Sequence, residues 1–450
     1  MIYNFLKIVV QLTLRIFYRE IVVQYPERLR QKGPLLLVVN HPNTLMDPLL
    51  VAAQLKQPVY FLTKSTFFIS PLQSKILRHL NLIPIYRAQD VPPEQQARAN
   101  DITFKTCYQY LNKGKSLLIF PEGTSVNERR LRPFKTGAAR MALGAEAQAN
   151  FKLGVKLLPV GLNYSDPTRF GGDVLVNVGE PIVVAGYEAA YRADAMQAAK
   201  QLTEKLEQEL KKLVVITDTD EDDELLQQLE QLYRPKLNAE FPQPPFQLTK
   251  AMEASLRFFR EREPVRVLAF KDKLKRYLYY LNRLRLHNSV LGDAGPAAGR
   301  ALLPDAVKFT VGLVLGFPLY LYGLLFNYLP YLLPARLADW LVEDEEYRAP
   351  VMMVTGMFVF PLFYALLGWA CFYVSGSGWV VALFLLSLPL SGFFVLYYWH
   401  HLLRTRSHWT LFTLLRRRRN LMQELYILRQ QIFTELEQAK QEYLEVVRKE

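Results

Sequence analysis

Pro34-Leu-Leu-Leu-Val-Val-Asn-His-Pro-Asn-Thr-Leu-Met-Asp-Pro48 is a short apolar run that leads directly into a polar loop. Consecutive apolar residues are typical of a strand that is covered on both faces, so the run predicts a central strand of an α/β sheet. The loop places His41 at the end of this strand and Asp47 six positions further on. A carboxylate beside an imidazole can fix its tautomer and leave the other ring nitrogen to accept a proton from a hydroxyl. The segment therefore predicts both the fold class and a candidate His–Asp pair.

Short apolar runs alternate with helical-length polar stretches through the range that we assign to one α/β domain, residues 26–190. This alternation predicts a mostly parallel central sheet flanked by helices. The helices are expected at 94–112 and 135–149. The other strands are expected at 58–63, 82–86, 117–120, 156–163 and 174–178.

Composition excludes several classes of protein. The 450 residues are too many for one compact core, and a hydrophobic share of 50% excludes a disordered chain. Only Cys107 and Cys371 are present, which excludes a disulfide framework or a cysteine-rich zinc module. The net charge of +13 predicts attraction to anionic lipid, phosphorylated substrates or nucleic acid. Nucleic-acid binding is not expected, because no helix-turn-helix, zinc finger or aromatic RNA-binding signature accompanies the charge.

The range 301–403 is expected to be a membrane domain. Residues 349–403 contain no Asp, Glu, Lys or Arg, and this length suffices for two crossings of about 20 residues each. Ser375-Gly-Ser-Gly378 divides it, which predicts a transmembrane hairpin of 350–374 and 379–403. A buried helical hairpin in a soluble protein is the alternative. A third apolar run, 309–333, contains prolines and glycines and either spans the bilayer or enters and returns.

The flanking segments suggest how the chain meets the membrane. Basic residues before 309 and after 403 favour the cytoplasmic side, which implies an even number of crossings and a multi-pass protein with its catalytic domain on the cytoplasmic face. Residues 1–25 are expected to form an interfacial amphipathic helix, with an ordinary surface helix as the alternative. Residues 191–300 are charged and helical by pattern. Residues 404–450 combine a basic juxtamembrane segment with a coiled-coil-like stripe, which suggests a homodimer through this helix or a single amphipathic helix.

A second motif, Phe120-Pro-Glu-Gly-Thr-Ser125, follows the predicted strand at 117–120. A strand that ends in such a turn exposes backbone N–H groups, and nearby cations would make the turn suitable for a phosphate. Cations follow at Arg129, Arg130, Arg132 and Lys135. A solvated basic face is the alternative interpretation of these four residues.

Together the two motifs and the membrane segments resemble the glycerol-phosphate and lysophospholipid acyltransferase family, over about residues 30–190. Within it, the pattern is similar to the fungal-type glycerol-3-phosphate and dihydroxyacetone-phosphate acyltransferase branch. Leu82-Ile-Pro-Ile-Tyr-Arg87 resembles the family block that ends in a phosphate-binding arginine, and Lys64 matches the lysine before the helix of the acyl tunnel. The common family motif has four residues between His and Asp, whereas His41 and Asp47 are separated by five.

The resemblance implies a membrane-bound acyltransferase of phospholipid biosynthesis. It would move a fatty acyl group from an acyl thioester to a hydroxyl of glycerol-3-phosphate or a lysophospholipid. No metal and no cofactor is implied; acyl-CoA or acyl-acyl carrier protein would be the co-substrate, and the phospholipid membrane a partner. The resemblance assigns His41 as general base, Asp47 as its orienting carboxylate, and as substrate-binding residues Arg87, Glu122, Gly123, Thr124, Lys135 and Lys64.

A different class of function stays open from the sequence. The basic surface and amphipathic ends would also suit a non-catalytic, membrane-binding lipid scaffold that carries a degenerate acyltransferase domain. The sequence leaves open the acceptor, the acyl donor, the chain length and the glycerol position.

Overall fold

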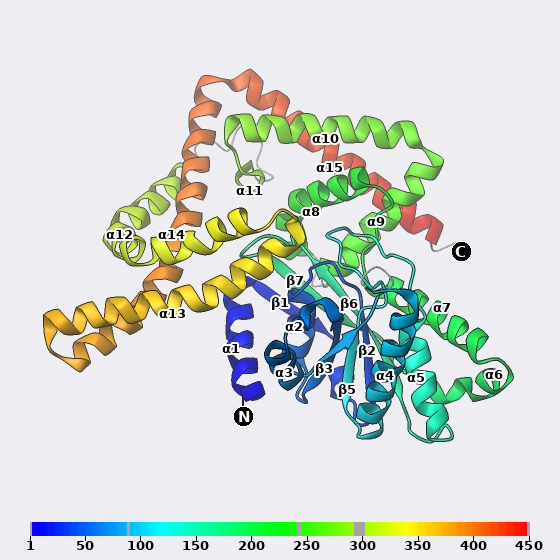
Figure 1. The fold of residues 1–450 in the computed structure, drawn as a ribbon. Helices are drawn as coiled ribbons and strands as arrows, with labels where there is room; N and C mark the ends of the chain where they lie inside the picture. Colours follow the sequence, from blue (N-terminus) through cyan, green and yellow to red (C-terminus); the bar gives the residue numbers. More distant parts are fainter. Residues whose placement is uncertain (1, 88–90, 241–244, 292–301, 448–450) are drawn as a thin grey trace. The chain divides into compact units, whose positions relative to one another are not determined.

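The computed structural model describes residues 2–87, 91–240, 245–291 and 302–447 (Figure 1). The chain forms two compact units, neither of which is continuous in sequence. The first, which we call the sheet unit, comprises Met1–Asp218 and Ala335–Thr355. The second, the helical unit, comprises Thr219–Pro334 and Gly356–Glu450.

The sheet unit is built on an 8-stranded, mostly parallel sheet, which confirms the predicted α/β class. Seven strands follow the order β1-β7-β6-β2-β5-β3-β4, and β8 pairs with β6. Among the strands that the structure describes, only the β6–β7 and β6–β8 pairs are antiparallel. Two strands, β1 and β8, were not expected from the sequence. The strand bounds are β1 Glu20–Gln24, β2 Leu35–Val39, β3 Val59–Lys64, β4 Leu82–Ile85, β5 Ser116–Ile119, β6 Lys156–Tyr164, β7 Asp173–Val178 and β8 Ile182–Val183.

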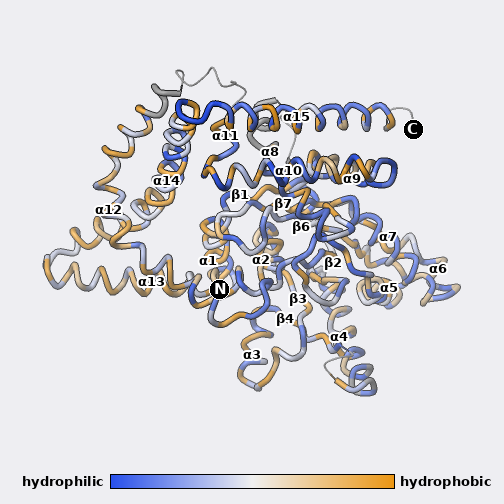
Figure 2. Tube along the Cα trace, turned by 90° about the horizontal axis from the view of Figure 1, so that it is seen from above, coloured by the Kyte–Doolittle hydropathy of each residue, from blue (hydrophilic) through white to orange (hydrophobic). Residues whose placement is uncertain are grey.

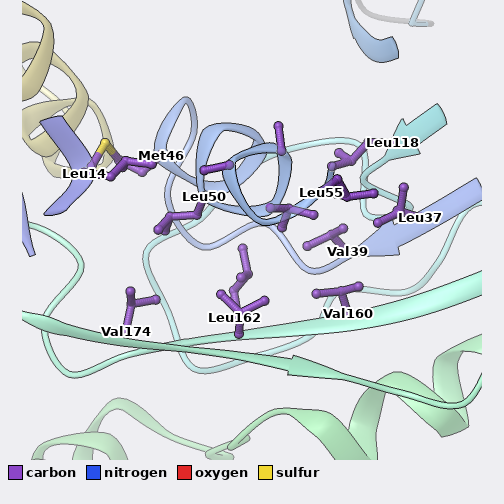
Figure 3. Packing of buried hydrophobic residues seen from close by; sticks show 14 of the residues in the cluster. Leu14, Leu37, Val39, Met46, Leu50, Leu55, Leu118, Val160, Leu162 and Val174 are labelled. Atoms are coloured by element: carbon purple, nitrogen blue, oxygen red, sulfur yellow. The ribbon is translucent and has the colours of Figure 1, made fainter. Parts of the chain in front are cut away.

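Strand β2 shows why the first apolar run is uninterrupted. Leu35, Leu37 and Val39 pack into a core on one face of the sheet. Leu36 and Val38 pack into a second core on the other face, because successive side chains of a strand point to opposite sides. Figure 3 shows the first core, where side chains of α1, α2 and the strands meet. The helices of this unit are α1 Ile2–Phe17, α2 Met46–Gln54, α3 Pro71–His79, α4 Pro93–Asn112, α5 Gly137–Gln148, α6 Glu188–Ala193 and α7 Ala195–Leu213.

Helix α1 has one face in the core and one face outside it. Leu14 and Phe17 are buried with the first core. Four large apolar residues on the other face are exposed, as an interfacial helix requires. The helix ends at Phe17, and the rest of the expected range 1–25 contains strand β1. The exposed residues are Phe5, Ile8, Leu12 and Ile16.

A short segment from far along the chain completes the sheet unit. Ala349 and Met353 are buried in the same core as α1 and α2, with exposed fractions of 1% and 2%. The hydroxyl of Thr44, in the loop after β2, donates a hydrogen bond to the carbonyl of Glu346 at 3.0 Å. The connection between α12 and α13 is therefore part of the unit that contains His41 and Asp47.

The helical unit has its own apolar core, formed mainly by α8, α10, α14 and α15. The apolar stripe of the C-terminal helix is buried within this chain: Leu425 and Ile432 share a core with Leu274 and Tyr277 of α10. This packing uses the face on which a coiled-coil dimer would depend, so the homodimer stays a prediction. The helices are α8 Asp220–Glu240, α9 Pro245–Arg262, α10 Pro264–Leu284, α11 Asn288–Leu291, α12 Leu302–Leu341, α13 Arg348–Ser375, α14 Gly378–Arg417 and α15 Arg419–Val447.

Three helices of the described residues are long and apolar enough to cross a membrane: Val307–Leu341, Glu345–Ser375 and Gly378–Arg417. Figure 2 shows α12 and α13 as largely hydrophobic along their length. The predicted break between the last two lies where expected, since α13 ends at Ser375 and α14 begins at Gly378.

Candidate active site

The site is built at the carboxyl end of β2, which lies between β5 and β6. The loop that leaves this strand is held by Asn40, whose buried amide forms two hydrogen bonds with the backbone of Leu162 in β6. The Asn40 amide donates to the Leu162 carbonyl at 3.0 Å, and its oxygen accepts from the Leu162 N–H at 2.7 Å. Because both bonds are to a neighbouring strand, the next residue, His41, leaves the sheet from a fixed point.

The loop brings the predicted His–Asp pair together. His41 Nδ1 lies 2.8 Å from Asp47 Oδ2, and the side chains are 17% and 0% exposed. Backbone N–H groups of Met46 and Asp47 both donate to the carbonyl of Asn43, at 2.9 and 3.2 Å, which makes a tight turn into α2. The turn accommodates the fifth intervening residue, so the unusual spacing keeps the two side chains in hydrogen-bond contact.

Asp47 accepts two further hydrogen bonds. The Asn43 N–H donates to Oδ2 at 2.7 Å, and the hydroxyl of Tyr164 donates to Oδ1 at 2.6 Å. Burial, and then the nearby charge of Asp47, raise the pKa of Tyr164 well above its usual value, which keeps this hydroxyl a donor. A carboxylate only accepts hydrogen bonds, so the proton of a neutral His41 lies on Nδ1 and its Nε2 carries the lone pair.

Residues in and next to the second motif, Phe120–Ser125, also position the ring of His41. Phe120 stacks on the imidazole with 3.7 Å between ring centroids and an interplanar angle of 10°. The backbone N–H of Val126 donates to the His41 carbonyl at 3.1 Å. The residues after β5 therefore restrain both the backbone and the ring plane of His41.

Glu122 connects the two motifs through the backbone. One carboxylate oxygen accepts from the N–H of His41 and the other from the N–H of Arg132, both at 3.0 Å. Burial raises the pKa of Glu122, while these two hydrogen bonds act in the opposite direction. Glu122 therefore joins the two motifs and shapes the turn, and its predicted contact with a substrate stays a prediction.

Two of the predicted cations converge on Gly123. Arg87, which follows β4, points a guanidinium nitrogen at the Gly123 carbonyl, 3.5 Å away. Lys135 covers the α-carbon of the same glycine, since a Cβ built there would lie 2.5 Å from Lys135 Nζ. Gly123 has a φ of 76°, which L side chains rarely adopt. The turn therefore requires glycine for its conformation, and a side chain at this position would displace the Lys135 ammonium group.

The remaining predicted residues are less closely connected. Thr124 is half-buried in the same turn, with its hydroxyl 3.5 Å from the carbonyl of Ser125. Lys64 is the last residue of β3, and within the described part of the chain no hydrogen bond or ion pair connects it to the His41 loop or the Gly123 turn. Among the residues that the structure describes, no group of three or more His, Cys, Asp or Glu side chains could hold a metal ion.

Sequence reasoning missed Tyr164 and Phe120. Phe120 occupies the last position before the Pro-Glu-Gly turn, so its place in the motif was a usable signal. Tyr164 is 117 positions from Asp47, and only the pairing of β6 with β2 brings their side chains together. No local pattern in the sequence indicates that contact.

Part of the chain is similar to known acyltransferases. Residues 20–163 match the family model described as Acyltransferase. Glycerol-3-phosphate O-acyltransferase 2 of Saccharomyces cerevisiae is 36% identical over 108 residues, which is 24% of this chain and 14% of the yeast protein. Glycerol-3-phosphate O-acyltransferase 1 of the same yeast is 26% identical over 181 residues, covering 38% of this chain and 24% of the relative. The matches thus span less than a quarter of the length of these two relatives.

Shorter relatives and one solved structure also match. The chloroplastic 1-acyl-sn-glycerol-3-phosphate acyltransferase BAT2 of Brassica napus is 30% identical over 152 residues, covering 33% of this chain and 41% of the relative. The crystal structure of the 1-acyl-sn-glycerophosphate acyltransferase PlsC from Thermotoga maritima aligns with 22% identity and a TM-score of 0.31, covering 45% of this chain and 79% of that one.

Proposed function

We propose that this protein is a membrane-bound enzyme that transfers a fatty acyl group from an acyl thioester to a hydroxyl of glycerol-3-phosphate or a lysophospholipid. The match of residues 20–163 to the Acyltransferase family model supports this proposal. The observation that carries the proposal is the contact of His41 Nδ1 with Asp47 Oδ2 at 2.8 Å, in a loop joined by Glu122 to the turn where Arg87 and Lys135 meet. A general base next to a cationic turn suits the hydroxyl of a phosphorylated acceptor.

The proposed reaction uses the free ring nitrogen of His41. Its Nε2 takes the proton from the acceptor hydroxyl as the hydroxyl oxygen attacks the thioester carbonyl carbon. The C–S bond breaks as the tetrahedral intermediate collapses, and the imidazolium returns its proton to the departing thiolate. Asp47 stabilises the imidazolium in between, and no acyl-enzyme forms.

The choice of acceptor follows from the cations and from the relatives. The guanidinium of Arg87 is suited to a phosphate because its planar N–H groups can donate in pairs. The matched relatives are named for glycerol-3-phosphate and 1-acyl-sn-glycerol-3-phosphate. Each of these two compounds carries a phosphate beside a hydroxyl. We therefore propose a phosphomonoester acceptor of this kind, with acyl-CoA or acyl-acyl carrier protein as donor.

The proposal is tested with the full-length protein in membranes. Radiolabelled acyl-CoA, or acyl-acyl carrier protein, is incubated with glycerol-3-phosphate, dihydroxyacetone phosphate or lysophosphatidic acid, and the lipid products are identified. We expect an acylated product with at least one acceptor. If no donor–acceptor pair gives product while the protein still binds phospholipid vesicles, the scaffold function is the better description.

Replacing Arg87 with alanine should mainly raise the KM for the phosphorylated acceptor, because the guanidinium is expected to contact the phosphate in both the ground state and the transition state. Losing a charge-assisted contact of this kind typically weakens binding by about ten-fold or more. Steady-state kinetics over acceptor concentration measures the change. Arg98, an exposed arginine on α4, supplies the matched control as Arg98→Ala. An unchanged acceptor KM in Arg87→Ala would contradict the phosphate role.

We also propose a membrane topology in which α13 and α14 cross and α12 enters and returns. The start of α13 and the end of α12 belong to the sheet unit, so both lie on its side of the membrane. The helices before α12 share a core with those after the crossing of α14, and only a short non-helical connection joins α7 to α8. In the proposed topology, helix α12 begins and ends on the same side.

Contacts between α12 and the two following helices support a path in which α12 enters the membrane and returns to the same side. Its first half lies along α14, where Tyr398 donates to the carbonyl of Leu313 at 2.9 Å and Asn327 donates to that of Leu388 at 3.1 Å. Asn327 also accepts from Tyr364 of α13, and beyond it Pro334 lies against Gly356 of α13. Figure 1 shows α12 changing direction along its length, and prolines inside a helix cause such bends. The three are Pro318, Pro330 and Pro334.

Cysteine labelling in sealed vesicles tests this topology. Burial raises the pKa of the Cys107 thiol to about 12, so replacing Cys371 with serine leaves a background that reacts slowly with maleimides. Single cysteines are then placed at the exposed positions Lys113, Asp344 and Ser375. An impermeant maleimide should label the first two from one side of the membrane and the third from the other. If the Lys113 and Asp344 cysteines react from opposite sides, α12 crosses the membrane fully; if Asp344 and Ser375 react from the same side, α13 does not cross.

A further inference from the structure

We propose that Tyr164 is a positioning residue of the reaction: its hydroxyl holds the Asp47 carboxylate so that the second oxygen faces His41. This inference rests on the proposed function. The Tyr164 hydroxyl donates to Asp47 Oδ1 at 2.6 Å, while Oδ2 accepts from His41 Nδ1 and the Asn43 N–H. Each carboxylate oxygen thus has its own donors, and rotation of the carboxylate would break all three hydrogen bonds together.

The three donors come from different parts of the fold. His41 and Asn43 belong to the same loop as Asp47, so their two bonds move with that loop. Tyr164 is the last residue of β6, which pairs with β2 on one side and β7 on the other. Among the described residues that hydrogen-bond to Asp47, Tyr164 is the one that connects its carboxylate to the sheet.

The spacing of the pair gives this connection its importance. With five residues between His41 and Asp47, the aspartate lies in the first turn of α2 and is separated from the strand end by the Asn43 turn. The Asp47 side chain is fully buried, with 0% exposure, so water does not replace a lost donor at Oδ1 without a rearrangement. The match to the family model ends at residue 163, one position before Tyr164.

The same core offers a matched control in Tyr18. Its ring lies 6.0 Å from that of Tyr164, and both side chains are buried in the first core of the sheet unit. In the described part of the chain, the Tyr18 hydroxyl makes no hydrogen bond to Asp47. Tyr→Phe at each position removes one buried hydroxyl and keeps the ring. The charge of Asp47 adds to burial in raising the pKa of Tyr18, so this hydroxyl lies near the carboxylate without bonding it, and the pair separates loss of the direct hydrogen bond to Asp47 from loss of a nearby buried hydroxyl.

Steady-state kinetics of the full-length protein test the proposal. Tyr164→Phe should lower kcat by about ten-fold or more, as expected for losing one hydrogen bond to a buried charged group. The KM values of donor and acceptor should not change, because Tyr164 contacts Asp47 and not a substrate. Tyr18→Phe should stay within about two-fold of the wild type in kcat.

A double variant separates positioning from stability. If Tyr164 acts through the His–Asp pair, Tyr164→Phe should add no further loss to a His41→Ala protein, because the element that it positions is already absent. The proposal is overturned if kcat of Tyr164→Phe matches the wild type, if Tyr18→Phe loses as much, or if the full Tyr164→Phe loss persists in the His41→Ala background. Wild-type turnover in His41→Ala would instead overturn the proposed general base.

Discussion

The His41→Ala variant should lose acyl transfer by roughly 10²–10⁴-fold, the usual contribution of a positioned general base. The substitution removes the nitrogen that would take the proton of the acceptor hydroxyl. It leaves the backbone contacts of residue 41 available, since the Glu122 oxygen binds its N–H and the Val126 N–H binds its carbonyl. The loop should therefore keep its conformation, and the fall in rate should reflect loss of the general base.

The measurement is the initial rate of radiolabelled product formation in membranes that contain equal amounts of each variant. His79, an exposed histidine at the end of α3, provides the matched control as His79→Ala, which should keep wild-type turnover. Membrane association should be the same for both variants. A His41→Ala protein with wild-type turnover would exclude His41 as the base, whatever the behaviour of the other site residues.

The parts of the fold that the sequence predicts are those with strong local patterns. The uninterrupted run Leu35–Val39 indicates a strand with both faces covered, and β2 is indeed central. By contrast, β1 is only half-buried, and its sequence Glu20–Gln24 is short and directly follows Arg19, so periodicity gives it no clear signal. Helix α2 was missed because it begins within the His–Asp motif and has only nine residues.

In the candidate site, too, the sequence predicts only the residues that lie in local patterns. His41, Asp47 and the Gly123 turn lie in two short motifs, and motifs are visible without a structure. Tyr164 and the segment around Met353 contribute through contacts between residues far apart in the chain. Such contacts depend on the order of the strands in the sheet and on the packing of the connection between α12 and α13 against the sheet unit. One sequence carries no direct record of either, so tertiary structure was required to find them.

The second large effect is expected for Asp47→Asn, which should lower kcat by roughly 10²–10³-fold through loss of the charge that stabilises the imidazolium. The three donors around Asp47 make this substitution informative. The Asn43 N–H points at the Oδ2 position at 2.7 Å, so the oxygen of the new amide, which accepts, is favoured there over its NH₂ group. His41 Nδ1–H can then still donate to that oxygen, and the tautomer with a free Nε2 is kept.

The NH₂ group of the substituted side chain would then face the hydroxyl of Tyr164, which can accept in place of donating. The loss in rate would accordingly measure the negative charge rather than a change of tautomer. Asp101→Asn is the control: Asp101 is exposed on α4 and pairs with Lys105 four residues on, a surface contact of little energetic consequence. Kinetics of both variants at saturating donor and acceptor give the comparison. If Asp47→Asn turns over within about three-fold of the wild type, a neutral hydrogen-bond acceptor suffices to orient His41, and the carboxylate has no electrostatic part in the reaction.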